Sequence, residues 1–68
     1  MTRLKVKEVA ETKHFSQRKL SMRSGVDIRT MQRIWRDPYK IVTTETLDKI
    51  AKVLGVDISE LVETVPDE

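Results

Sequence analysis

One face of the segment 28–36 carries side chains that can form paired hydrogen bonds with a flat partner. When this segment is wound as a helix at about 100° per residue, Met31 and Ile34 lie on one side. The polar residues lie on the other side, and they are Arg29, Gln32, Arg33 and Arg36. Arginine can bind guanine with two hydrogen bonds, glutamine can bind adenine in the same way, and an aliphatic side chain can contact the thymine methyl group, as Ile28 at the border of this face could. The alternative is a face that is merely solvated, as most charged helix surfaces are.

The residues before this segment predict that it is the second helix of a helix-turn-helix. Leu20 and Ser24 share one face of a short helix, and the small Ser21 would let a second helix approach closely. Gly25 stands where a tight turn requires a positive φ. Asp27 can cap the next helix by accepting a hydrogen bond from its free amides. A unit of this kind places its second helix in the major groove of DNA.

Side chains at the ends of these two helices are candidates for contacts with DNA phosphates. Ser16 is an expected N-cap, so Gln17 occupies the first helical position beside free amides that can bind an anion; the alternative is a solvated first-turn residue. Asp37 and Pro38 end the second helix, because proline disfavours helical geometry in the preceding residue. The loop beyond would pass near the sugar-phosphate backbone, or Tyr39 could pack on the flank of the domain. The predicted phosphate contacts are Gln17, Arg18, Arg36, Tyr39 and Lys40.

The composition indicates a small domain that binds rather than catalyses. The chain has 68 residues, of which 38% are hydrophobic and 35% are charged, so it forms one domain with a small core. It contains no cysteine and one histidine, so we expect no disulfide framework, metal-ligand set or nucleophile relay. No apolar run approaches the roughly 20 residues of a membrane span, and the start lacks the apolar core of a signal peptide. We therefore expect a cytoplasmic protein without catalytic residues, cofactor, metal or small-molecule effector.

The net charge of +2 is unevenly distributed along the chain. Between residues 13 and 40, eight basic residues accompany two acidic ones, whereas between residues 41 and 68 two lysines accompany seven acidic residues. The positive charge is therefore concentrated on the predicted helix-turn-helix. There it would attract phosphate and make the affinity fall with rising salt concentration.

Two further helices are predicted on either side of the motif. A first helix is expected over residues 6–13, with Leu4 entering in a more extended conformation. A later helix, capped by Thr43 or Thr44 and ended by Gly55, carries the strongest apolar repeat in the chain.

A last short helix is expected to begin at Asp57, with Glu60 three residues later as in a capping box. Its apolar residues are Ile58, Leu61 and Val62. Together these segments predict an all-α fold, a compact bundle of about five short helices in which helices 2 and 3 form the helix-turn-helix. The domain would span residues 1–68, with a core over about 4–63 and a short acidic tail over 64–68.

The arrangement resembles the Xre family of lambda-repressor-like helix-turn-helix domains over about residues 4–62. The resemblance rests on the segment TLDKIAKVLGVDISELV and on Gln17, Leu20, Ser21, Gly25, Val26, Met31 and Ile34. The family implies five helices, with the third in the major groove. It also implies that Gln17 binds phosphate and steadies the recognition helix. The base contacts that it implies are Ile28, Arg29, Gln32 and Arg33.

Some positions depart from the family's pattern. Ala10 and Trp35 stand where family members often have an arginine and a glutamate in an ion pair, and we expect Trp35 to cover Ala10. His14 stands where a glycine is common, and a turn role is expected for it because histidine tolerates the left-handed conformation better than most residues. The loop 37–42 lacks the usual glycine.

The sequence therefore predicts sequence-specific binding of double-stranded DNA by a small transcriptional regulator, most simply a repressor. One helix covers only a few base pairs, so a homodimer on a palindromic site, with half-sites about 34 Å apart, is expected. The alternative is a protein-interaction or antitoxin-like module that uses the same fold to bind a partner protein. That alternative favours an exposed apolar patch on the last helix, where Leu61, Val62 and Val65 could also meet a second copy, whereas DNA binding requires an open arginine face.

Overall fold

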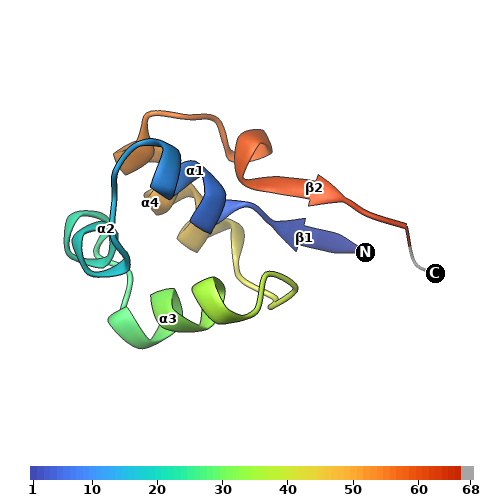
Figure 1. The fold of residues 1–68 in the computed structure, drawn as a ribbon, viewed down its shortest axis with the longest axis horizontal. Coiled ribbons are helices and arrows are strands. Elements are labelled where there is room, and N and C mark those ends of the chain that lie inside the picture. Colours follow the sequence, from blue (N-terminus) through green and yellow to red (C-terminus); the bar gives the residue numbers. More distant parts are fainter. Residues whose placement is uncertain (67–68) are drawn as a thin grey trace.

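A computed structural model describes residues 1–66 as a helical domain closed by a small sheet (Figure 1). Its four α-helices are α1 (Val6–Thr12), α2 (Gln17–Ser24), α3 (Ile28–Arg36) and α4 (Thr44–Leu54). The other elements are the 3-10 helix η1 (Ile58–Leu61) and the strands β1 (Thr2–Leu4) and β2 (Val62–Thr64). The prediction of about five helices in an all-α fold is therefore wrong in part, because the last helix is a single 3-10 turn and the described residues include a two-stranded sheet. Asp67 and Glu68, the end of the expected acidic tail, lie outside the described residues.

The α-helices begin and end where the sequence predicts. The Ser16 hydroxyl accepts a hydrogen bond from the Lys19 amide at 3.1 Å, and the Thr43 hydroxyl accepts one from the Thr46 amide at 3.2 Å. These bonds satisfy amides that have no partner inside the helix. Gly55 ends α4 in the left-handed conformation, with φ 71°. Thr43 is thus the cap of α4, which settles the choice between Thr43 and Thr44.

The sheet joins the two ends of the described chain. Strand β1 pairs with β2 in antiparallel register, with Thr2 opposite Thr64 and Leu4 opposite Val62. Val62 was expected to continue the last helix, but its backbone is extended, with φ −135° and ψ 154°. A β-branched residue is well suited to this conformation, and the ladder to β1 satisfies backbone groups that one 3-10 turn would leave open.

Arg3 connects the sheet to the first helix. Its guanidinium lies 2.6 Å from a carboxylate oxygen of Glu8 and 2.7 Å from one of Glu63. The hydrogen bonds that the guanidinium donates to both carboxylates raise the pKa of Arg3. Burial is the largest single influence on the pKa of Glu8 and raises it, but the hydrogen bonds from Arg3 and from the backbone, with the charges of Arg3 and Lys5, together outweigh it, so the net shift of the pKa is downward. Because these side chains are partly exposed, the contribution of the ion pairs to stability is modest.

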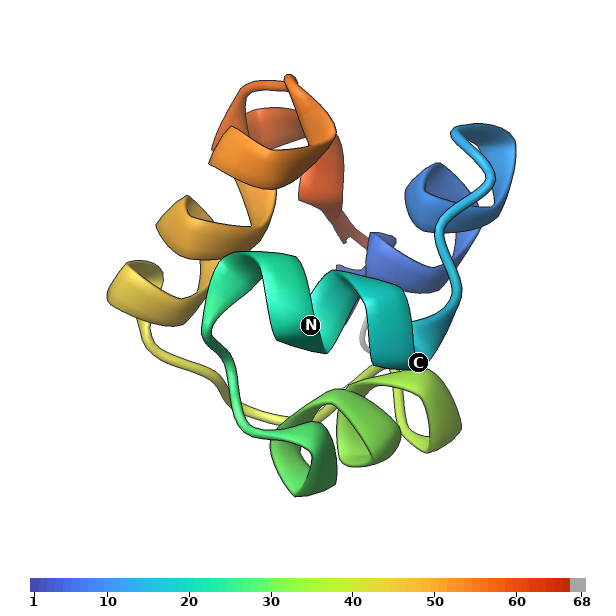
Figure 2. The same cartoon turned by 90° about the vertical axis from the view of Figure 1, so that its left-hand side faces the viewer.

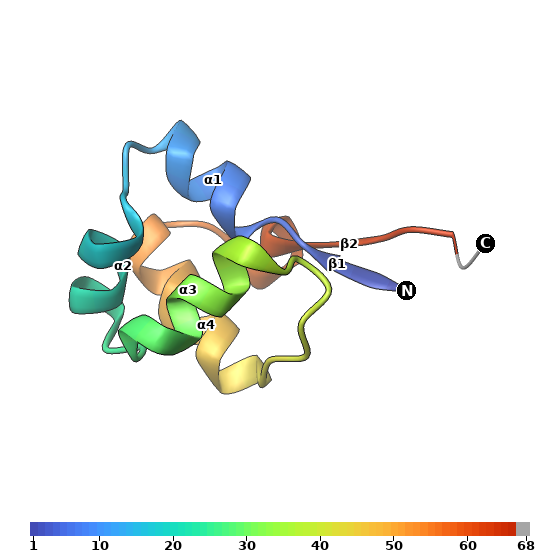
Figure 3. The same cartoon turned by 60° about the horizontal axis from the view of Figure 1, so that its bottom comes forward.

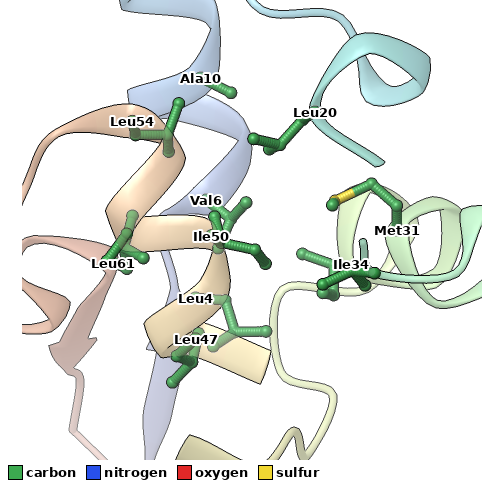
Figure 4. Close-up of a cluster of buried hydrophobic side chains, with 12 residues drawn as sticks. Leu4, Val6, Ala10, Leu20, Met31, Ile34, Leu47, Ile50, Leu54 and Leu61 are labelled. Carbon is green, nitrogen blue, oxygen red and sulfur yellow. The ribbon is translucent and has the colours of Figure 1, made fainter. Parts of the chain in front are cut away.

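Side chains from the helices, from η1 and from β1 meet in one core (Figure 4). Its fully buried members include Val6 from α1, Leu20 from α2, Met31 from α3, Ile50 from α4 and Leu61 from η1. Each helix therefore turns one apolar stripe inward, as an amphipathic helix of a globular domain does. The burial of Leu61 means that the last turn presents its main apolar side chain to the core rather than to a partner.

His14 forms the turn between α1 and α2 in the way that the sequence predicts. Its φ is 62°, the left-handed conformation in which glycine is common. Its amide donates a hydrogen bond to the Glu11 carbonyl at 3.1 Å, which helps to end α1. Phe15 follows and packs against the core, with the Lys19 ammonium 5.1 Å from the centre of its ring. This turn fixes where α2 begins, and with it the position of Gln17.

Candidate nucleic-acid interface

The turn between α2 and α3 is held by one glycine and two serines. Gly25 ends α2 with φ 78°, the positive value that the sequence predicts for it. The hydroxyl of Ser21, buried between the helices, donates a hydrogen bond to the Val26 carbonyl at 2.6 Å. The Ser24 hydroxyl donates to the Leu20 carbonyl at 2.7 Å and lies 3.3 Å from the Val26 amide, which donates to it. These bonds fix the backbone between the two helices, so α3 has a defined orientation on α2.

Helix α3 separates an anchored face from an open one. The Asp27 carboxylate accepts a hydrogen bond from the Arg29 amide at 3.2 Å and so caps the helix, as expected. Met31 and Ile34 are buried in the core. The polar residues of the other face, all exposed, are Arg29, Gln32, Arg33 and Arg36. In Figure 3, which brings the lower side of the molecule forward, α3 lies in front of α4 with no element covering it.

The arginines of this face form no ion pair with another side chain within residues 1–66. Within residues 1–66, the ion pairs involve Arg3, Lys49 and Lys52, and none of them engages a guanidinium of α2 or α3. Unpaired like charges on one helix face repel one another, and an anionic partner would relieve that repulsion. This surface therefore suits a polyanion better than a neutral partner.

Gln17 lies next to the open face of α3, although it belongs to α2. A shallow depression between the two helices is lined by Gln17, Gln32, Trp35 and Arg36. Figure 2 shows α2 lying directly above α3. As the first residue of α2, Gln17 also stands beside the amides at the helix N-terminus, which attract anions. Three of the predicted DNA contacts, Gln17, Gln32 and Arg36, are thus brought together.

Ile28 lies at the border of the open face, as predicted, and is 37% exposed. A second depression joins it to Gln17, Arg18 and Gln32, and also to Met22, which is 75% exposed. Met22 was not among the candidates predicted from the sequence. Its position on α2 could have indicated that it is exposed. The residues one turn earlier are charged, so Met22 does not belong to an apolar stripe of that helix. With Ile28, it places apolar surface beside the arginine face, where a thymine methyl group would be a fitting contact.

Tyr39 and Lys40 lie in the loop after α3 and face a different groove. The Tyr39 amide donates to the Asp37 carboxylate at 3.0 Å, and the Lys40 amide donates to the Asp37 carbonyl at 3.2 Å. Tyr39 is 47% exposed, and with Lys40 it lines a groove beside Leu4 and Val62 of the sheet. The structure thus separates these two candidates from the depression that contains Gln17.

Trp35 makes an apolar contact with the core. It stands at a position where members of the Xre family often have one residue of an ion pair. Ala10 is fully buried, and Trp35 is half-buried and packs against the core to which Ala10 belongs. Trp35 also lines a depression with Lys7 and Glu11 of α1. Trp35 therefore lies at the junction between the end of α3 and α1.

Residues 1–66 contain no group of three or more side chains arranged to hold a metal ion. Over the same range, no helix has the length and the apolar character that crossing a membrane requires. The apolar residues of η1 point toward the core, so the exposed patch favoured by a protein-interaction module is not found on that element.

The sequence comparison agrees with the geometry. Residues 5–67, nearly the whole chain, match the family model of Cro/C1-type HTH DNA-binding domains. This match confirms the resemblance that was inferred from the glycine turn and the apolar pattern. No curated protein matches the chain.

Proposed function

Because the chain belongs to the family of Cro/C1-type helix-turn-helix DNA-binding domains, we propose that it is a sequence-specific transcriptional regulator, most simply a repressor. The observation that carries this proposal is the open face of α3, where arginines that form no ion pair within residues 1–66 stand on a helix whose other face is fixed in the core. Such a helix can enter the major groove, which is wide enough to admit one and offers a distinct pattern of hydrogen-bonding groups at each base pair.

In this proposal α3 contacts the edges of the bases. Arg29 and Arg33 are suited to guanine, Gln32 to adenine, and Ile28 to the methyl group of thymine. The exposure of all four side chains supports this assignment.

The phosphate contacts would come from both sides of α3. Gln17 and Arg18 lie at the start of α2, and Arg36 lies at the end of α3. Tyr39 and Lys40 follow in the loop, which would meet the backbone farther along the same groove. These contacts would position the helix without reading sequence.

We further propose that two copies bind a palindromic site, because a single helix reads too few base pairs for useful specificity. The half-sites would then be about 34 Å apart. Such a regulator acts in the cytoplasm, and a bound pair of copies represses by occupying the promoter.

Selection of bound sequences from a random duplex pool, at two salt concentrations, tests the proposal. We expect an inverted repeat, with an affinity that falls as the salt concentration rises. Titration of the protein with the selected duplex should shift the amide resonances of residues 28–36. If no duplex shifts these resonances at low ionic strength, the proposal is wrong.

A further inference from the structure

An apolar groove lies between the sheet and the loop that follows α3. Its volume is about 440 Å³, and its inner side is formed by Leu4, Val42, Leu47 and Val62. Thr2 and residues 39–41 form its edges together with Met1. The charged groups among the residues that line it are the Lys40 ammonium and the N-terminal ammonium of Met1. Because its inner side is apolar, the groove can receive an apolar side chain.

The edge of the groove carries the most exposed large apolar side chain of the described residues. Ile41 is 94% exposed, and the neighbouring Tyr39 is 47% exposed. An isoleucine left in water forgoes the hydrophobic stabilisation that burial would give it, and contiguous exposed apolar surface marks contact sites. A protruding apolar side chain and an apolar groove thus stand side by side on one loop.

We propose that this surface is the contact between two copies of the chain, with Ile41 of each copy seated in the groove of the other. This inference rests on the proposed function and names the surface that pairs the two copies. A two-fold contact requires a patch that is complementary to itself. The loop 39–42 meets this requirement, because it supplies both a projection, Ile41, and part of the groove that would receive it.

The position of the groove suits two copies on one duplex. The loop begins directly after Arg36, the last residue of α3, and lies on the same side of the molecule as the sheet (Figure 3). A two-fold axis beside this loop would bring the two α3 helices together by their C-terminal ends. The open arginine face of each α3 would stay uncovered, since none of its residues lines the groove.

The size of the groove predicts when the contact forms. Nine of the described residues line it, whereas a stable interface uses roughly 20–30 residues on each side. The contact is therefore too small to hold free copies together. The contact between two copies forms on DNA, where it makes binding to the two half-sites cooperative.

The experiment compares binding to the selected inverted repeat with binding to one isolated half-site. For the natural chain, the second copy should bind about 5- to 150-fold more tightly than a copy on the half-site, a usual range for coupling between sites. Ile41→Gln should bring the ratio of these two affinities, that of the second copy on the repeat over that of a copy on the half-site, close to one. It should leave the half-site affinity unchanged. Ile41→Val should keep most of the ratio, because it keeps an apolar side chain. Lys52→Gln, an exposed change on α4 outside the groove, should keep all of it.

Cross-linking tests the geometry directly, because the chain has no cysteine of its own. An Ile41→Cys chain mixed with a tagged Thr2→Cys chain should form a mixed disulfide under mild oxidation on the inverted repeat, and little of it without DNA. Lys52→Cys mixed with Thr2→Cys should form none.

The outcomes separate this inference from the proposed function. If Ile41→Gln retains the full ratio, or if every selected site binds a single copy, the groove does not pair two copies and the inference is overturned, while DNA binding by α3 stands. If the natural chain binds no half-site and no repeat, both proposals fall together.

Discussion

The hydroxyl of Ser21 offers a quantitative test of how the helix-turn-helix is held. In the Ser21→Ala variant the buried Val26 carbonyl loses a hydrogen bond of 2.6 Å, and leaving a buried acceptor unsatisfied costs about 1–3 kcal/mol. Alanine favours a helix more than serine does, by about 0.5 kcal/mol. We therefore expect a net loss of about 0.5–2.5 kcal/mol in the free energy of unfolding. In a domain of this size, each kcal/mol lowers the melting temperature by about 4–8 °C.

Urea and thermal unfolding, followed by circular dichroism, would measure this loss. Ser59→Ala is the matched control, because its hydroxyl also donates a hydrogen bond, to the Asp57 carboxylate at 2.7 Å, but in an exposed position. We expect that control to change stability by less than about 0.5 kcal/mol. A Ser21→Ala variant as stable as the natural chain would refute the idea that this bond holds the turn.

Other perturbations separate the roles assigned to individual side chains. Arg29→Ala or Arg33→Ala should cost about 1–3 kcal/mol on the selected site and much less on random DNA, measured by titration; equal losses on both would reassign these residues to phosphate. Gln17→Ala and Lys40→Ala should weaken binding to all sequences alike, and a loss confined to the selected site would contradict that role. Because the pKa of Glu8 is lowered in the folded state, its ion pair stabilises the fold above the unfolded value of about 4.3, and that contribution is lost as the pH falls through the lower folded value. Acid unfolding curves should show this loss, and Glu8→Gln should reduce it.

The helices and their ends were predictable because the responsible signals are local. A cap and its amide lie within one helical turn, and a left-handed turn depends on one residue, as at Gly25 and His14. The two faces of α3 were likewise predictable, since a period of 3.6 residues decides which side chains share a face. These signals need no knowledge of the rest of the chain.

The sheet was not predictable, because its strands have three residues each and pair across almost the whole chain. Strands this short show no alternating pattern, and the apolar spacing around Val62 fits a helix equally well. The grouping of Met22 with Ile28, and the separation of Tyr39 from Gln17, also depend on how distant elements pack. A prediction from local pattern cannot contain that information.

The ladder between β1 and β2 has a consequence for the order in which the protein folds. The Val65 amide bonds to the Met1 carbonyl, 64 positions away, while α2 and α3 are neighbours in the chain. Closing so long a loop is entropically costly. We therefore expect neighbouring helices to associate first and the terminal strands to pair last. The same strands are then the first to fray, and their amides should exchange with deuterium sooner than those of the helical centre.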